Sequence, residues 1–148
     1  MGARKRNIAE QRKEKKKTTY SAMLRNCPSS PRKMRLVADL VRGVEVNKAL
    51  DMLRYSTKDA SKDIEKLVMS AISNWQGKNE NVRLEDSQLY IKEISVDQAR
   101  TLKRIRPAPQ GRAYRVRKRS NHVTVILGSR NEEVKTGSVE KETEVKTN

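Results

Sequence analysis

Residues 98–130 read QARTLKRIRPAPQGRAYRVRKRSNHVTVILGSR, and they combine a run of basic residues with apolar residues at the C-terminal end. No Asp or Glu occurs between Asp97 and Glu132, although Arg and Lys are frequent there. Two prolines and a glycine fall in the middle, within Pro107–Gly111, and they favour a turn because proline fixes φ and glycine admits unusual backbone angles. The stretch therefore predicts two strands joined by a turn, with a middle too cationic to bury.

Apolar residues bound this middle and predict the strand roots of a folded body. His122–Leu127 (HVTVIL) is rich in β-branched residues, as strands are. Gln88–Asp97 alternates, with Tyr90, Ile94 and Val96 expected on one face and Leu89 and Ile91 on the other.

A turn centred near Ala108 leaves about ten residues on each side beyond the body, so the arm reaches on the order of 30 Å. A lone two-stranded hairpin is marginal in water, and its like charges repel one another. We therefore expect the arm to need a polyanion around it.

The composition points to the same kind of partner. Lys and Arg total 34 against 18 Asp and Glu, which gives a net charge of +16. Such an excess favours nucleic acid, because phosphate contacts release counterions and dominate the affinity. With one Trp, four Tyr and no Phe, we expect recognition of backbone and shape rather than a platform of stacked bases.

Several function classes are disfavoured. One Cys and one His cannot form a disulfide within the chain or a zinc site of those residue types. We find no glycine-rich phosphate loop, nucleophile triad or metal cluster, so we expect no enzyme activity and no cofactor. No apolar run approaches the ~18 residues of a membrane span, so no membrane partner is expected. A single Cys fits a reducing compartment, and a cytoplasmic location is expected.

The chain divides into three parts by composition. Residues 1–19 are basic and nearly devoid of apolar side chains, which predicts a disordered N-terminal extension that binds phosphates. Residues 20–130 are expected to form a single α+β domain: three helices packed on a small antiparallel β-sheet, with a long protruding β-hairpin arm at about 92–122. Residues 131–148 are predicted to be a disordered tail.

The helices are marked by caps and apolar periodicity. Ser29 or Ser30 is expected to cap a helix with Pro31 in its first turn, and Gly43 to stop it. Glu45–Tyr55 is a second helix. Ser56 or Thr57 is expected to open a third and longest one, which ends at Gly77 and carries Trp75 at one end of the core.

Leu102 and Ile105 are apolar residues in the cationic arm, and two interpretations are equally open. They are simply exposed or packed across the strands, or they insert into a crevice of the partner.

Four segments, in this order, carry a family resemblance. They are Ser29–Gly43 (SSPRKMRLVADLVRG), Lys103–Pro107 (KRIRP), Gly111–Ala113 (GRA) and Arg117–Val125 (RKRSNHVTV). In order and spacing, from about Ala22 to Arg130, the chain resembles bacterial large-subunit ribosomal protein twenty-two.

The resemblance implies a structural constituent of the large ribosomal subunit that supports subunit assembly. Its implied partners are large-subunit ribosomal RNA, neighbouring ribosomal proteins and the nascent polypeptide, with no homo-oligomer. The hairpin would run through the RNA and line the polypeptide exit tunnel, near where macrolides bind. Charge and resemblance together give the expected RNA-binding residues: Arg25, Arg32, Lys33, Arg35, Arg100, Lys103, Arg104, Arg106, Gly111, Arg112, Arg115, Arg117, Lys118 and Arg119. The tip expected near the tunnel comprises Leu102, Lys103, Arg104, Ile105, Arg106, Pro107, Ala108, Pro109 and Gln110.

The chain departs from the family pattern in three places. The family core has no equivalent of residues 1–19 or of the tail after Arg130. At the tip, Pro109–Gln110 stands where the family commonly has a small residue and a Lys, so one tip charge is missing.

Two other functions remain as alternatives to the ribosomal one. The first is an architectural DNA-binding protein whose cationic β-arm wedges open a minor groove. The second is a soluble chaperone of RNA or nascent chains.

Overall fold

The computed structural model describes residues 3–79 and 87–130. Within these ranges the chain forms four helices and three strands. In chain order they are α1 (Ala3–Thr18), β1 (Tyr20–Cys27), α2 (Pro31–Val41), α3 (Val46–Arg54), α4 (Asp59–Gln76), β2 (Leu89–Pro107) and β3 (Ala113–Ser129).

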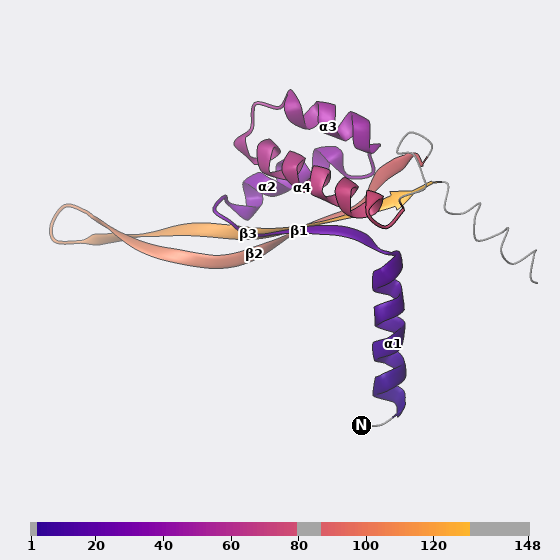
Figure 1. Cartoon of the computed structure of the whole chain (residues 1–148). Coiled ribbons are helices and arrows are strands. Elements are labelled where there is room, and N and C mark those ends of the chain that lie inside the picture. Colours follow the sequence, from indigo (N-terminus) through magenta and orange to yellow (C-terminus); the bar gives the residue numbers. More distant parts are fainter. Residues whose placement is uncertain (1–2, 80–86, 131–148) are drawn as a thin grey trace, which may run out of the picture.

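The strands form one antiparallel sheet with β3 in the centre, in the order β1-β3-β2. Helices α2, α3 and α4 lie together over one face of this sheet, and β2 and β3 continue beyond it as a long two-stranded arm (Figure 1). The predicted α+β class, with helices on a small antiparallel sheet and a protruding hairpin, is thus confirmed. The helix count was wrong by one, because α1 was not expected.

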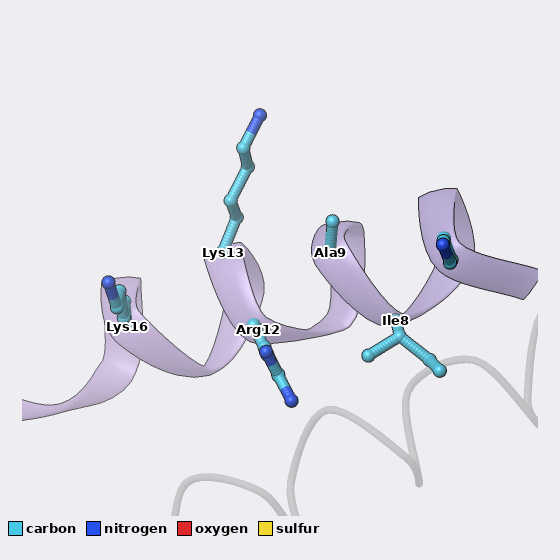
Figure 2. A pocket seen from close by; sticks show the side chains of 6 residues that line it. Ile8, Ala9, Arg12, Lys13 and Lys16 are labelled. Atoms are coloured by element: carbon cyan, nitrogen blue, oxygen red, sulfur yellow. The ribbon is translucent and has the colours of Figure 1, made fainter. Parts of the chain in front are cut away.

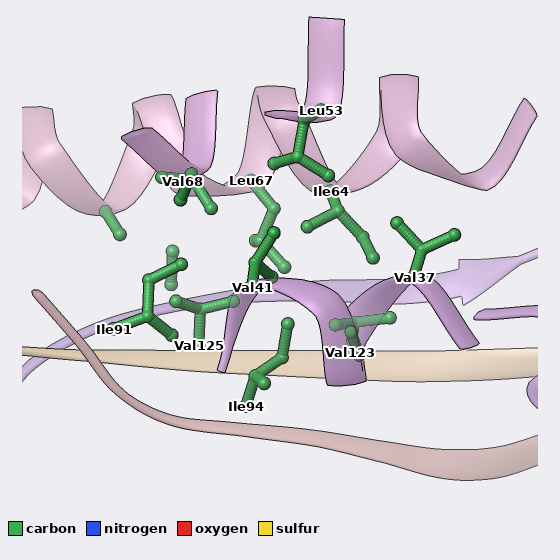
Figure 3. Close-up of a cluster of buried hydrophobic side chains, with 14 of the residues drawn as sticks. Val37, Val41, Leu53, Ile64, Leu67, Val68, Ile91, Ile94, Val123 and Val125 are labelled. Atoms are coloured by element: carbon green, nitrogen blue, oxygen red, sulfur yellow. The ribbon is translucent and has the colours of Figure 1, made fainter. Parts of the chain in front are cut away.

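A single core lies between the sheet and the three covering helices. Figure 3 shows the apolar side chains of the helices and strands pointing toward one another. The apolar side of α2 fills its centre, since Met34, Val37 and Val41 are completely buried. Ile64 and Val68 of α4 are also completely buried. Burial of each such side chain stabilises the folded state by roughly 1.5–3 kcal/mol. This core is therefore the main source of stability of the folded body.

The first helix, α1, occupies a segment for which the sequence predicted a disordered extension. Its described side chains are all exposed from Ala3 to Lys16, and none belongs to the core. The residues are mostly Ala, Arg, Lys, Glu and Gln, which have the highest helix propensities. Low apolar content predicted the missing core contacts, but it did not reveal this propensity for local structure.

Strand β2 carries an irregularity that changes the predicted facing of its residues. Its pairing with β3 shifts between Ile91 and Glu93, so Ile91, Ile94 and Val96 are all buried. The alternation in Gln88–Asp97 predicted Ile91 on the face opposite to Ile94 and Val96, and this prediction was wrong. A β-bulge inserts one extra residue and so reverses the alternation at that point.

The hairpin turn lies two residues further along than predicted. Pro107 pairs with Ala113, which centres the turn on Gln110 rather than on Ala108. Gln110 and Gly111 both have left-handed backbone angles, with φ of 61° and 69°. Gly111 adopts this conformation at little energetic cost because it has no side chain. The position of Gly111, next to Gln110, therefore determines where the turn forms.

The helix boundaries differ from the prediction in one cap. Ser30 is the residue before α2, and Pro31 occupies the first turn as expected, although the Ser30 side chain makes no capping hydrogen bond. Lys58, rather than Ser56 or Thr57, directly precedes α4. In the described part of the chain, no helix has the length and apolar character needed to cross a membrane.

Candidate nucleic-acid interface

The arm begins where the side chains of β2 and β3 leave the core. Val96 and Asn121 are the last buried residues on the two strands, and beyond them Lys103–Pro107 and Gly111–Arg119 are exposed throughout. At ~3.3 Å per residue, the strand from Val96 to Pro107 reaches on the order of 35 Å. The arm is therefore a ribbon with solvent on both faces.

Positive charge on the arm is unbalanced. The ion pairs seen among the described residues join Arg6 to Glu10, Arg42 to Asp39, Lys48 to Glu45 and Arg54 to Glu65. None of them includes a residue of the arm. A ribbon of unneutralised Arg and Lys repels itself and attracts polyanions.

The register divides the arm into two faces, because directly opposite residues of paired strands project to the same side. The first, called here the Arg117 face, pairs Lys103 with Arg117 and Ile105 with Arg115, and near the root Thr101 with Arg119. Its cations therefore include a directly opposed pair, Lys103 and Arg117. Like charges placed so are destabilising unless an anion lies between or over them.

The second face, called here the Tyr114 face, alternates cations with apolar residues across the strands. Its pairs are Leu102 with Lys118, Arg104 with Val116, and Arg106 with Tyr114. No two cations are directly opposed here.

The root of the arm is joined to the start of α2 by a buried amide. Asn121 is completely buried, and its Nδ2 donates to the carbonyl oxygen and to Oγ of Ser29 at 2.8 and 2.9 Å. Cys27 of β1 pairs with the same residue. These contacts place exposed Arg25, Arg32 and Lys33 next to the root, so the cationic surface continues from the arm onto the body.

Arg35 has a structural contact in addition to its predicted role. Its Nε and Nη2 donate to the carbonyl oxygen of Val96 at 3.3 and 3.0 Å. Arg42 donates likewise to the carbonyl oxygen of Ile94 at 3.2 Å. Because β2 is an edge strand, these two guanidinium groups satisfy carbonyl groups that no further strand can pair.

Helix α1 is a second cationic element, and it projects away from the sheet (Figure 1). Figure 2 shows Ile8 and Arg12 extending from one side of the helix while Lys13 extends from the other. The end of α1 is held to the body, because Lys78 Nζ donates to the carbonyl oxygens of Thr19 and Lys16 at 2.9 and 3.4 Å. Lys78 also lies over the Tyr20 ring, 5.3 Å from its centroid.

All of the predicted RNA-binding residues are exposed, and they lie on the arm, on β1 close to its root and in the first turns of α2. The tip residues Leu102–Gln110 are exposed as well, except for half-buried Ala108. Tyr114 and Val116 of the arm were not singled out from the sequence. Their alternation with Lys118 in a strand was the signal that could have revealed them.

The comparison with protein families gives one match over most of the chain. The family model described as "Ribosomal protein L22p/L17e" matches residues 22–128. A protein of Christiangramia forsetii named large ribosomal subunit protein uL22 is 63% identical over 131 residues, which cover 88% of this chain and 97% of that protein. Proteins of the same name from Flavobacterium psychrophilum and Porphyromonas gingivalis are 61% and 60% identical over 131 residues, again covering 88% of this chain and 96% and 97% of theirs.

Proposed function

The chain belongs to the ribosomal protein L22p/L17e family, and from that premise we propose that its arm binds large-subunit ribosomal RNA and lines the polypeptide exit tunnel. Membership makes the chain a structural, non-enzymatic constituent of the large subunit of the cytoplasmic ribosome. It works in translation as part of a ribonucleoprotein, with ribosomal RNA and ribosomal proteins as its partners. The alternative of an architectural DNA-binding protein gains no support from this family.

The observation that carries the RNA-binding proposal is the unneutralised arm. Gln98–Ser120 contains no acid, and its cations are exposed on both faces. A ribbon of this kind is stabilised when phosphates surround it, and RNA supplies them on every side. Binding to the RNA and ordering of the arm are then the same event.

The body adds a second set of phosphate contacts at the root. Arg25, Arg32 and Lys33 lie next to Asn121 and Ser29, so RNA that follows the arm meets them as it reaches the body. Arg35 contacts phosphate through those guanidinium N–H groups that do not donate to the Val96 carbonyl oxygen. Arg100, exposed at the irregular pairing between Gln98 and Thr101, lies at the same junction.

We assign residues 1–19 a phosphate-binding role as well. Helix α1 presents Arg and Lys on several sides and lies outside the core. It serves as a second anchor, while residues 20–130 act as the single folded domain. Residues 131–148, predicted to be a disordered tail, lie outside the described part of the chain.

The tip is the part proposed to reach the tunnel. The turn through Pro109–Arg112 is narrow and exposed, and Ile105 beside it is 76% exposed. An apolar side chain near the tip of a cationic arm can form part of a tunnel wall along which a nascent chain moves. In this role the protein does not act as a homo-oligomer.

The experiment that tests RNA binding replaces Arg112, Arg115 and Arg119 together by Ala. Association with large-subunit RNA should weaken, and assembly of large subunits in sucrose gradients should slow. Cooperative unfolding of the free body, followed by circular dichroism, should not change, since these side chains are exposed. Unchanged RNA affinity, or loss of cooperative unfolding, would contradict the proposal.

The tunnel role is tested by shortening the arm without changing its faces. Deleting Lys103–Arg104 together with their partners Val116–Arg117 removes two residues from each strand and preserves the alternation. Subunits should assemble, while macrolide susceptibility and the progress of nascent chains should change. A failure of assembly would mean that the tip is needed to fold the RNA instead.

A further inference from the structure

The Tyr114 face leaves apolar surface in water on an arm that has no core. Tyr114 is 65% exposed, Leu102 46% and Val116 39%. On the Arg117 face only Ile105 is comparable, and that face has no aromatic residue. A phosphate-binding surface does not require an aromatic ring. The two faces therefore differ in the kind of chemical group that they can bind.

Each apolar residue of the Tyr114 face lies directly opposite a cation. Leu102 is opposite Lys118, Val116 is opposite Arg104, and Tyr114 is opposite Arg106. Directly opposite side chains start about 5 Å apart. An occupant of this face must therefore offer apolar surface and negative charge side by side at that spacing.

A nucleotide has this combination, since its base is flat and largely apolar and its phosphate lies a few ångströms away. A protein surface that covered this face would have to bury three cations among its apolar groups, which is costly unless each is paired. Tyr114 and Arg106 are in addition the two kinds of planar side chain on which unpaired RNA bases stack.

We propose that the Tyr114 face binds unpaired nucleobases of RNA, with Tyr114 and Arg106 as the stacking groups, while the cations of the Arg117 face bind phosphates and no bases. The inference rests on the proposed RNA-binding function and assigns different chemistry to the two sides of the same arm. It confines base contact to one stripe of the arm, in a chain that has few aromatic residues overall.

The test compares two single-stranded probes that carry the same phosphates. One is a fluorescently labelled oligoadenylate of twelve nucleotides, and the other is its abasic counterpart. Affinities of the full chain for both are measured by fluorescence anisotropy over a series of salt concentrations. The wild-type chain should bind oligoadenylate about tenfold more tightly than the abasic probe, because one stacked base contributes about that factor.

Two substitutions at one position separate stacking from other causes. Tyr114→Phe keeps the ring and should keep the preference for oligoadenylate. Tyr114→Ala should reduce the preference to the part that Arg106 supplies, without changing affinity for the abasic probe or the salt dependence. The matched control on the other face, Arg117→Gln, should weaken both probes equally and reduce the salt slope.

Equal wild-type affinity for the two probes overturns the inference, and so does a Tyr114→Phe variant whose preference falls as that of Tyr114→Ala does. Failure of the proposed RNA-binding function looks different. In that case the abasic probe binds without salt dependence, or does not bind, and Arg117→Gln changes nothing.

Discussion

Lys78 donates from Nζ to the carbonyl oxygen of Thr19 over 2.9 Å, so the residue just beyond α4 holds the end of α1. The last carbonyl groups of a helix have no partner within it, and a cation there also interacts favourably with the helix dipole. This contact fixes where α1 leaves the body and hence where its charges are presented.

Replacing Lys78 by Met should loosen α1 without unfolding the body. Cleavage after Glu10 and Glu14 by a glutamate-specific protease should become about two- to fivefold faster, since an exposed hydrogen bond of this kind contributes about 0.5–1 kcal/mol. Lys62→Met, at an exposed position near the start of α4, is the control and should cleave as wild type does. Equal cleavage of the two variants would show that Lys78 does not hold the helix.

Replacing Arg35 by Met should destabilise the free protein as well as weaken RNA binding. The Val96 carbonyl group on the edge of β2 loses two donors, so the free energy of unfolding in urea should fall by about 1 kcal/mol. Arg32→Met, an exposed neighbour on the first turn of α2, should weaken RNA binding and leave unfolding unchanged. If both variants unfold alike, the contact of Arg35 with the edge strand is energetically neutral.

Replacing Lys103 by Glu should stabilise the folded hairpin of the free arm and lower its affinity for RNA. It converts a directly opposed like-charge pair with Arg117 into an ion pair, which stabilises the free arm by roughly 0.2–1 kcal/mol. Amide hydrogen exchange in the arm should slow, while affinity for large-subunit RNA falls. Arg104→Glu lies opposite Val116, and it should lower the affinity without slowing exchange. Faster exchange in Lys103→Glu would refute the repulsion argument.

Replacing Gly128 by Ala should destabilise the body through one contact. A Cβ atom there would meet Cε1 and Cζ of Tyr90 at 3.0 Å, so the ring must shift. Thermal or urea unfolding should show a loss of about 1–2 kcal/mol, typical of overpacking. In a Tyr90→Ala background the same change should be neutral or favourable, because glycine is a poor strand residue. A loss of equal size in both backgrounds would place the strain elsewhere.

The features that depend on charge and apolar spacing could be predicted from the sequence. The helix with Pro31 in its first turn, the strand His122–Leu127 and the cationic hairpin all follow from such patterns, and these predictions were correct. The position of the turn at Gln110 and the bulge after Ile91 depend on single backbone conformations, which apolar spacing does not encode. The contacts of Lys78 and Arg35 join residues 59 and 61 positions apart, and any exposed cation could have made them.

The position of β3 has a mechanical consequence. It is one unbroken strand from Ala113 in the arm to Ser129 in the body, and in the body it is paired on both sides, with β1 and with β2. A pull along the arm therefore loads two ladders of hydrogen bonds in shear, all at once, rather than peeling them apart one after another. Strand β3 connects the tip directly to the middle strand of the sheet. A force applied to the tip is therefore distributed over the whole folded body.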